Sequence, residues 1–177
     1  MSPAGPRRVV LALGSNLGER LAHLQDGLEV LGTAPGLGRL AVSPVYETVP
    51  VGGPPQGDYL NAVVIADTLL PARAILERAH RAEAAVHRVR AGRWGPRTLD
   101  VDVIVCGAET SDDPELTLPH PRAHERAFVL APWHDLEPDA QLPGRGRIAD
   151  LLAKVGCAGL RRLPDARLRT PACGQDG

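Results

Sequence analysis

The chain has 177 residues, a formal net charge of −1 at pH 7 and an apolar content of 44%. This length fits one domain around one hydrophobic core, and the near-zero charge argues against a general nucleic-acid binder. The three cysteines, Cys106, Cys157 and Cys173, are odd in number and far apart, so we expect neither a disulfide framework nor a zinc site. No run reaches the roughly 18 apolar residues of a membrane helix, and we therefore expect a soluble, cytoplasmic protein with no membrane partner.

The N-terminal third of the chain predicts a strand, a helix and a second strand. Residues 8–13 form an apolar run typical of a short buried strand, and a Gly-Ser-Asn turn follows it. Leucines at helical spacing from residue 21 onward predict a helix that Gly32 caps. Residues 40–48 predict the second strand, in which Pro44 indicates an edge position or a bulge.

The middle of the chain completes a recognisable order of elements. A loop rich in proline and glycine covers residues 49–58, and a strand is predicted over residues 59–68. Pro71 opens a helix that runs to about His87, and a run of β-branched residues predicts a further strand over residues 98–106. This βαββαβ order is that of a ferredoxin-like α+β fold, in which helices pack on one face of an antiparallel sheet.

The C-terminal part predicts an extension of helices and loops on this core. Residues 116–130 read as a polar loop that leads into a short apolar helix, and residues 148–155 predict a closing helix. Residues 165–177 lack periodicity, so we expect them to form a flexible tail. The sequence therefore predicts a single domain over residues 1–164 with a tail after it.

The strongest chemical signature lies where an arginine-rich loop meets the strand over residues 98–106. Four arginines, at positions 88, 90, 93 and 97, precede Asp100 and Asp102, which a period of two places on one face of the strand. Adjacent carboxylates repel each other, whereas Mg²⁺ binds one or two of them and takes its other ligands from water and phosphate. Guanidinium groups also match phosphate oxygens, so the pattern indicates phosphoryl-type transfer. The alternative is a solvated pair of aspartates beside a surface loop.

Several segments of the chain also resemble the motifs of one enzyme family. They are Gly14-Ser-Asn-Leu, Tyr46-Glu-Thr-Val-Pro-Val-Gly, Asp58-Tyr-Leu-Asn-Ala and Arg93-Trp-Gly-Pro-Arg-Thr-Leu-Asp-Val-Asp-Val-Ile. Together they resemble the 6-hydroxymethyl-7,8-dihydropterin pyrophosphokinases, and the similarity runs from about Val9 to Pro138. The resemblance implies transfer of pyrophosphate from ATP to the hydroxymethyl group of the pterin, which gives AMP and the pterin diphosphate in folate biosynthesis.

The resemblance further implies roles for individual residues. Asp100 and Asp102 would hold two Mg²⁺ ions, and Arg88 and Arg97 would act in catalysis. The residues expected to bind the pterin are Gly14, Thr48, Val49, Pro50, Val51, Tyr59, Asn61 and Phe128. The residues expected to bind ATP are Glu83, Arg90, Trp94, Val103, Thr117, His120 and Arg126.

Some features of the chain depart from that family pattern or keep other functions open. His87 stands where the family usually has glycine, Pro121 follows His120, and Glu115 occupies a position where a basic residue can occur. Glu83 fits a solvated helix position equally well. We expect a monomeric enzyme with small-molecule substrates. A metal-dependent phosphodiesterase or nuclease, and a non-catalytic nucleotide- or pterin-binding module, are the two alternatives.

Overall fold

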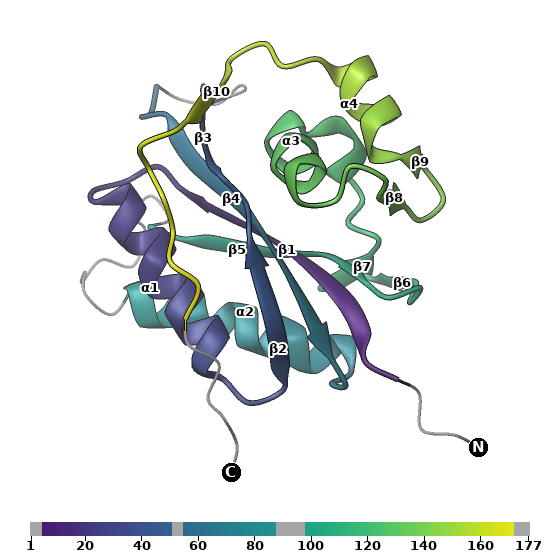
Figure 1. Ribbon diagram of the computed structural model, residues 1–177. Coiled ribbons are helices and arrows are strands. Elements are labelled where there is room, and N and C mark those ends of the chain that lie inside the picture. The colour runs from purple at the N-terminus through teal and green to yellow at the C-terminus, as the bar shows by residue number, and fades with distance from the viewer. Residues whose placement is uncertain (1–4, 51–54, 88–97, 172–177) are drawn as a thin grey trace.

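A computed structural model describes residues 5–50, 55–87 and 98–171 of the chain (Figure 1). The elements before the arginine-rich segment are β1 (Arg7–Ser15), α1 (Arg20–Thr33), β2 (Leu37–Val42), β3 (Val45–Thr48), β4 (Tyr59–Thr68) and α2 (Ala72–His87). Those after it are β5 (Asp100–Cys106), β6 (Ser111–Asp113), β7 (Leu116–Leu118), a 3₁₀ helix (Ala123–Glu125), α3 (Ala127–Leu136), β8 (Gln141–Leu142), β9 (Gly146–Arg147), α4 (Ile148–Val155) and β10 (Leu160–Leu163).

The main sheet confirms the predicted ferredoxin-like topology. Its strand order is β10-β3-β4-β1-β5, with β2 also paired to β4, and every pair is antiparallel. Strand β1 therefore lies between β4, which follows the loop after β3, and β5, which follows the arginine-rich segment. Strand β10, which the sequence pattern did not reveal, adds to the outer edge of β3. Its four residues are half-buried at most, so they leave only a weak periodic signal.

Helices cover both faces of this sheet, whereas the sequence predicted a helical layer on one face. Helices α1 and α2 lie on one side, and α3 and α4 lie on the other (Figure 1). A hydrophobic core lies on each face of the sheet, and successive residues of β1 contribute to them in turn. Val9 and Leu11 pack under α1 and α2. Val10 packs with Val129 and Trp133 of α3. Because β1 is buried on both faces, its sequence is a continuous apolar run without alternation.

The second predicted strand is divided at a proline. Strands β2 and β3 replace the single strand expected over residues 40–48, with Ser43 and Pro44 between them. Pro44 has no N–H to donate to a ladder. Ser43 compensates, because its N–H donates to the Val63 carbonyl (2.9 Å) and its Oγ accepts from the Val63 N–H (2.8 Å). The chain thereby changes direction without losing contact with β4.

Gly32 does not cap α1 as predicted. It is buried in the last turn of the helix, which ends at Thr33, and Ala34 then adopts an extended conformation. A Cβ atom on Gly32 would lie 2.5 Å from Cγ of Pro171, so glycine is required there for the close approach of the C-terminal segment.

Residues 165–171, the first part of the expected flexible tail, lie along α1 (Figure 1). Leu168 packs against the core beneath α1 and α2. The Gln25 side chain holds the backbone of Arg169 on both sides, by donating to its carbonyl (2.9 Å) and accepting from its N–H (2.8 Å). Residues 172–177 of the predicted tail lie outside the described residues.

The region after β5 is more regular than the predicted polar loop. Strands β6 and β7 form a short hairpin, and the 3₁₀ helix precedes α3. Helix α4 occupies the predicted residues. In the described part of the chain, no helix combines the length and apolar character needed to cross a bilayer.

We expect Leu28→Ala to lower the free energy of unfolding by about 2–5 kcal/mol, because the fully buried side chain leaves a cavity beneath α1. Leu69→Ala is the matched control, since Leu69 is 72% exposed, and its effect should stay within about 0.5 kcal/mol. Urea unfolding followed by circular dichroism measures both. Equal losses in the two variants would contradict the assigned core.

Candidate active site

A cleft of about 510 Å³ opens at the end of the sheet where β1 leads into α1, on the face that α3 covers. Strand ends form one wall of the cleft, and the segment that enters α3 forms the opposite wall. The lining residues are Ala12, Leu13, Gly14, Thr48, Val49, Pro50, Gln56, Tyr59, Asn61, Asp100, Asp102, His120, Arg122, Glu125, Arg126 and Phe128.

The strand wall is a row of residues placed by register. Gly14 of β1 lies opposite Asn61 on one side and opposite Asp100 on the other. Thr48 of β3 lies opposite Tyr59 of β4, and its Oγ1 accepts a hydrogen bond from Asn61 Nδ2 (2.8 Å). Four strands therefore contribute residues to one surface, and β3, β4 and β5 supply its polar side chains, although they come from distant parts of the chain.

Glycine at position 14 allows the Asn61 amide to approach the backbone of β1. A Cβ atom there would lie 3.0 Å from Asn61 Oδ1 and would have to displace it. Asn61 is only 5% exposed, so its orientation is held by the Thr48 hydrogen bond and by this close contact. A buried amide fixed in this way presents a defined edge for hydrogen bonding to a ligand.

The two predicted metal ligands lie on the same face of β5, as the period of two requires. Asp102 lies opposite Ala12, and its Oδ2 is 3.5 Å from Nη1 of Arg126 and 3.9 Å from Nε2 of His120. Asp102 keeps 45% of its side chain exposed, which leaves it accessible to a cation or ligand in the cleft. The Asp100 carboxylate also lines the cleft.

His120 is held neutral beside this carboxylate. Burial lowers the pKa of His120 below its ordinary value, and the opposing effect of Asp102 does not reverse the shift. The Arg122 N–H donates to Nδ1 (3.2 Å), so the neutral ring carries its proton on Nε2, toward Asp102. The backbone N–H of His120 donates to the Ile104 carbonyl of β5 (2.9 Å), and this bond holds the segment that precedes α3 to the sheet.

Arg126 and Phe128 join the expected nucleotide and pterin sides of the cleft. The Arg126 guanidinium lies 5.5 Å from the centroid of the Phe128 ring, within cation–π range. Arg126 directly precedes α3, and Phe128 lies in its first turn. The start of α3 therefore places a guanidinium group and an aromatic ring next to each other.

Three predicted ATP-binding residues do not line the cleft. Val103 is buried beneath α1 and α2. Thr117 lies on β7, where its Oγ1 donates to the Asp113 carbonyl (3.0 Å). Glu83 of α2 accepts a hydrogen bond from the Val101 N–H (2.9 Å), so it holds β5 at the point between the two aspartates. Five further predicted residues, Val51, Arg88, Arg90, Trp94 and Arg97, lie outside the described residues.

Sequence reasoning missed three polar residues of the lining. Gln56 is held by the Asn16 amide, which donates to its Oε1 (2.8 Å). Arg122 and Glu125 lie in the turn between His120 and α3, and their place in the same polar segment as His120 was an available signal. Gln56 lacked such a signal, because it lies in a loop without periodicity.

Two of the departures from the family pattern have structural partners. Glu115 accepts a hydrogen bond from Arg73 of α2 (2.8 Å), so it anchors the β6–β7 hairpin. The Nδ1 atom of His87 lies 2.8 Å from Oγ1 of Thr98, which joins the end of α2 to the start of β5.

Comparisons with known proteins agree on one family. Residues 10–138 match the model of the family described as 7,8-dihydro-6-hydroxymethylpterin-pyrophosphokinase (HPPK). The chain belongs to this family. It is a diphosphotransferase of folate biosynthesis, which moves pyrophosphate from ATP to 6-hydroxymethyl-7,8-dihydropterin.

Curated relatives carry the name 2-amino-4-hydroxy-6-hydroxymethyldihydropteridine pyrophosphokinase. The protein from Mycobacterium tuberculosis is 51% identical over 150 residues, which cover 78% of this chain and 77% of that protein. The protein from Pseudomonas aeruginosa is 41% identical over 160 residues, which cover 90% and 99% respectively. These matches support the family assignment along most of both chains.

A solved structure supports the same fold. A crystal structure of Plasmodium falciparum HPPK-DHPS matches with a TM-score of 0.70 at 14% identity, over 95% of this chain and 51% of that one. The present chain thus spans about half the length of that protein, and at this identity the likeness concerns the fold alone.

We expect opposite shifts of the His120 pKa when its two charged neighbours are removed. Asp102→Asn should lower it, because the carboxylate raises the pKa, and Arg126→Met should raise it, because the guanidinium lowers it. NMR titration of the imidazole signals measures both relative to the unsubstituted protein. Shifts in the same direction, or a midpoint above 6.5 in the unsubstituted protein, would contradict the described geometry.

Proposed function

We propose that this pyrophosphate transfer takes place in the cleft, with the pterin held at the β3–β4 side and the triphosphate of ATP at the β5 side. The observation that carries the proposal is the placement of Asp100 and Asp102 in one cleft with Tyr59, Asn61 and Phe128. The two substrates must meet for direct transfer, and this row of residues places an aromatic site next to a carboxylate pair.

The pterin site combines two aromatic side chains with a fixed amide. Tyr59 comes from the strand wall and Phe128 from α3, so they approach the cleft from different layers. A flat heterocycle between them would gain stacking and burial, while Asn61 would hydrogen-bond its edge. Gly14, Thr48, Val49 and Pro50 line the same end of the cleft and would complete this site.

Asp100 and Asp102 are suited to hold Mg²⁺. In the described residues, no cluster of three or more His, Cys, Asp or Glu side chains could form a metal site supplied by the protein alone. Mg²⁺ does not require such a cluster, because it binds one or two carboxylates and completes its octahedron with water and phosphate oxygens. We propose two Mg²⁺ ions at this pair, which when bound would neutralise phosphate charge.

Positioning and charge neutralisation account for the chemistry. A bond forms between the pterin hydroxymethyl oxygen and the β-phosphorus, the bond from that phosphorus to the oxygen retained by AMP breaks, and the alcohol proton is released. Arg126 would bind phosphate oxygens, and neutral His120 would donate a hydrogen bond from Nε2. Arg88 and Arg97 remain our proposed catalytic arginines, with Arg90 and Trp94 as further ATP contacts.

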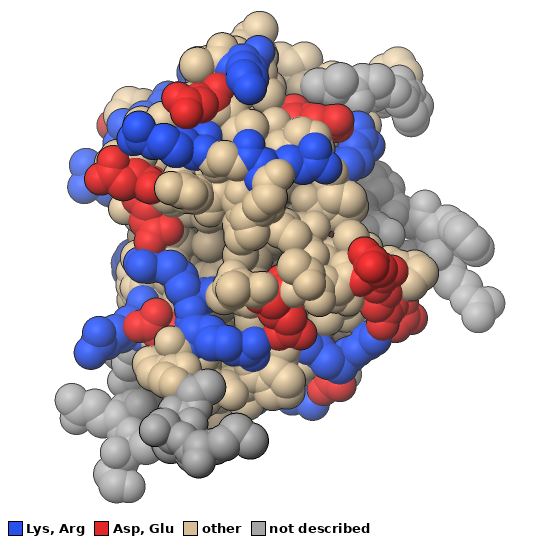
Figure 2. All heavy atoms as spheres, turned by 90° about the vertical axis from the view of Figure 1, so that its right-hand side faces the viewer, with Lys and Arg blue, Asp and Glu red and all other residues tan. Residues whose placement is uncertain are grey.

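Two other functions would use the same residues differently. A phosphodiesterase or nuclease would use the carboxylate pair on a phosphodiester, yet the net charge of −1 gives no general attraction for nucleic acid. On the one face that Figure 2 shows, acidic and basic residues are interspersed around an uncharged centre. A binding module would hold ligands without turnover. Incubation with ATP, Mg²⁺ and the pterin alcohol separates these functions, because only the proposed function yields AMP and the pterin diphosphate. We further propose a monomer, since one chain supplies both sides of the cleft. Its proposed location is the cytoplasm.

We expect Asp100→Asn and Asp102→Asn each to reduce turnover by about 100-fold or more, because each removes a metal ligand from a site with few of them. Asp112→Asn on β6 is the control, since this exposed side chain lies outside the cleft, and it should keep normal turnover. Steady-state release of AMP measures all three. Turnover within tenfold of normal in either cleft variant would count against the magnesium assignment.

We expect Tyr59→Ala and Phe128→Ala each to weaken pterin binding by about 1–3 kcal/mol, which is the scale of lost stacking and burial. Binding of a non-hydrolysable ATP analogue should change much less. Isothermal titration calorimetry with each ligand separates the effects. Equal losses for both ligands would indicate that the aromatic residues support the fold instead.

A further inference from the structure

Arg20, the first residue of α1, joins two segments behind the pterin end of the cleft. Its Nη1 donates to the Asp58 carbonyl (2.7 Å), and its Nη2 forms an ion pair with Glu47 Oε2 (2.9 Å). The Arg20 side chain is 30% exposed and that of Glu47 is 17% exposed. A guanidinium can hold two acceptors in a fixed relation because its donors are rigidly spaced.

The two acceptors directly precede two residues of the cleft. Glu47 precedes Thr48 at the end of β3, and Asp58 precedes Tyr59 at the start of β4. The β3–β4 ladder has only three register pairs, and Thr48 with Tyr59 is the last of them. Thr48 also pairs with Leu160 of β10. Ends of short ladders fray readily, so an additional contact at this position helps to hold both residues.

Arg20 acts from the face opposite the cleft. Leu60, the ladder partner of Glu47, packs in the core beneath α1 and α2, whereas the neighbouring Tyr46 bonds through its hydroxyl to Asp135 of α3. Because successive side chains of a strand point to opposite faces, Glu47 and its guanidinium partner lie on the α1 side of the sheet. Arg20 therefore does not line the cleft that contains the substrates.

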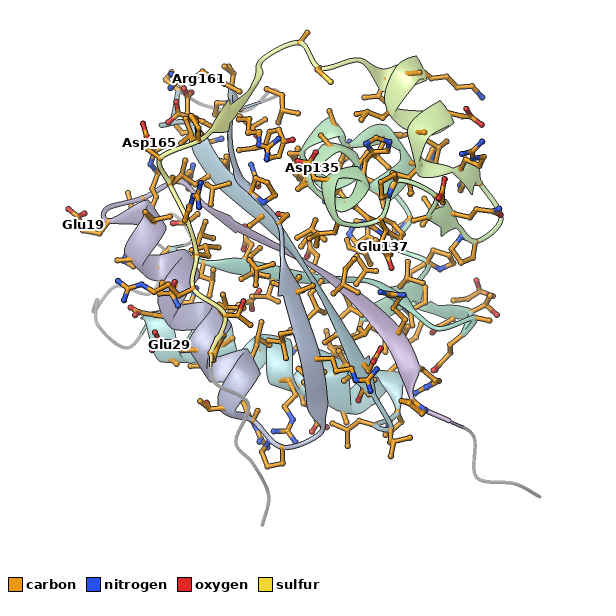
Figure 3. The ribbon with its side chains drawn as sticks, viewed as in Figure 1. Glu19, Glu29, Asp135, Glu137, Arg161 and Asp165 are labelled. Carbon is orange, nitrogen blue, oxygen red and sulfur yellow. The ribbon has the colours of Figure 1, made fainter. Side chains whose placement is uncertain are left out.

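Strand β10 supplies a second cation to the same carboxylate. Arg161 donates to the other oxygen of Glu47, and Figure 3 shows Arg161 on β10, which pairs with β3. Hydrogen bonds from Arg161 and Arg20 lower the pKa of Glu47, so the carboxylate is charged near neutral pH. Both its oxygens are thus occupied, and Glu47 is fixed relative to α1 and β10 together.

We propose that Arg20 is a positioning residue for the pterin, which pre-orders Thr48 and Tyr59 through Glu47 and the Asp58 carbonyl. The inference rests on the proposed location of the pterin site. It predicts an effect on one substrate, because the contacts that the structure describes for Arg20, Glu47 and Arg161 do not include Asp102, His120 or Arg126 at the other side of the cleft.

The test compares Arg20→Met with Arg147→Met, a control on β9 whose ion pair with Asp139 lies away from the cleft. Arg20→Met should weaken pterin binding roughly five- to a hundredfold, the factor expected when two side chains must be ordered upon binding. The dissociation constant of a non-hydrolysable ATP analogue should stay within about twofold, and Arg147→Met should change neither.

Two further variants separate positioning from general stability. Arg20→Lys should give an intermediate loss, because one ammonium does not reproduce the forked contact with both acceptors. Glu47→Gln combined with Arg20→Met should lose less pterin affinity than the two single losses predict together, because both act through one contact.

Three outcomes would overturn the inference: unchanged pterin binding in Arg20→Met, equal weakening of both ligands, or full additivity with Glu47→Gln. Failure of the proposed pterin site would appear differently, as unchanged pterin binding in Tyr59→Ala as well.

Discussion

The register of β1 between β4 and β5 is the constraint on which the candidate active site depends. It places Gly14 opposite both Asn61 and Asp100, and Ala12 opposite Asp102. A slip of β5 by one residue would turn the aspartates into the core beneath α1 and α2, where unpaired carboxylates are costly. The apolar residues that alternate with them, Val101 and Val103, are buried there instead, so core packing selects the register that exposes the carboxylates to the cleft.

The second helical layer turns this row of residues into a cleft. Helix α3 and the segment before it supply His120, Arg126 and Phe128. The Tyr46 hydroxyl donates to the carboxylate of Asp135, which Figure 3 shows on α3. Burial, followed by that hydrogen bond, raises the pKa of Tyr46, so the phenol stays protonated and keeps donating. The bond ties α3 to β3, the strand that ends in Thr48. This hydrogen bond therefore holds the wall formed by α3 to the wall formed by the strands.

The charges of the cleft match a reaction that needs no protein nucleophile. Arg126 lies 3.5 Å from Asp102, and neutral His120 adds a hydrogen-bond donor without adding charge. The substrate brings its own hydroxyl, so the protein contributes alignment and electrostatic stabilisation. The contacts of Glu47 with Arg20 and Arg161, on the α1 side of the sheet, matter for such a reaction, because small displacements of bound groups reduce the rate of direct transfer.

The sequence alone determined the elements whose signals are local. The strand over residues 59–68, the helix ending at His87 and the placement of Asp100 and Asp102 on one face follow from periodicity within a few residues, and the structure confirms each. Tertiary structure decided the features that depend on distant partners. Gly32 serves a contact with Pro171, β10 forms only because β3 offers an edge, and Glu83 is bound by the Val101 N–H. Arg20 likewise appears in sequence as an ordinary helix-start residue, and only folding brings Glu47 and Asp58 to it. Hydrophobic periodicity records which face of an element is buried, but it carries no record of what the element is buried against.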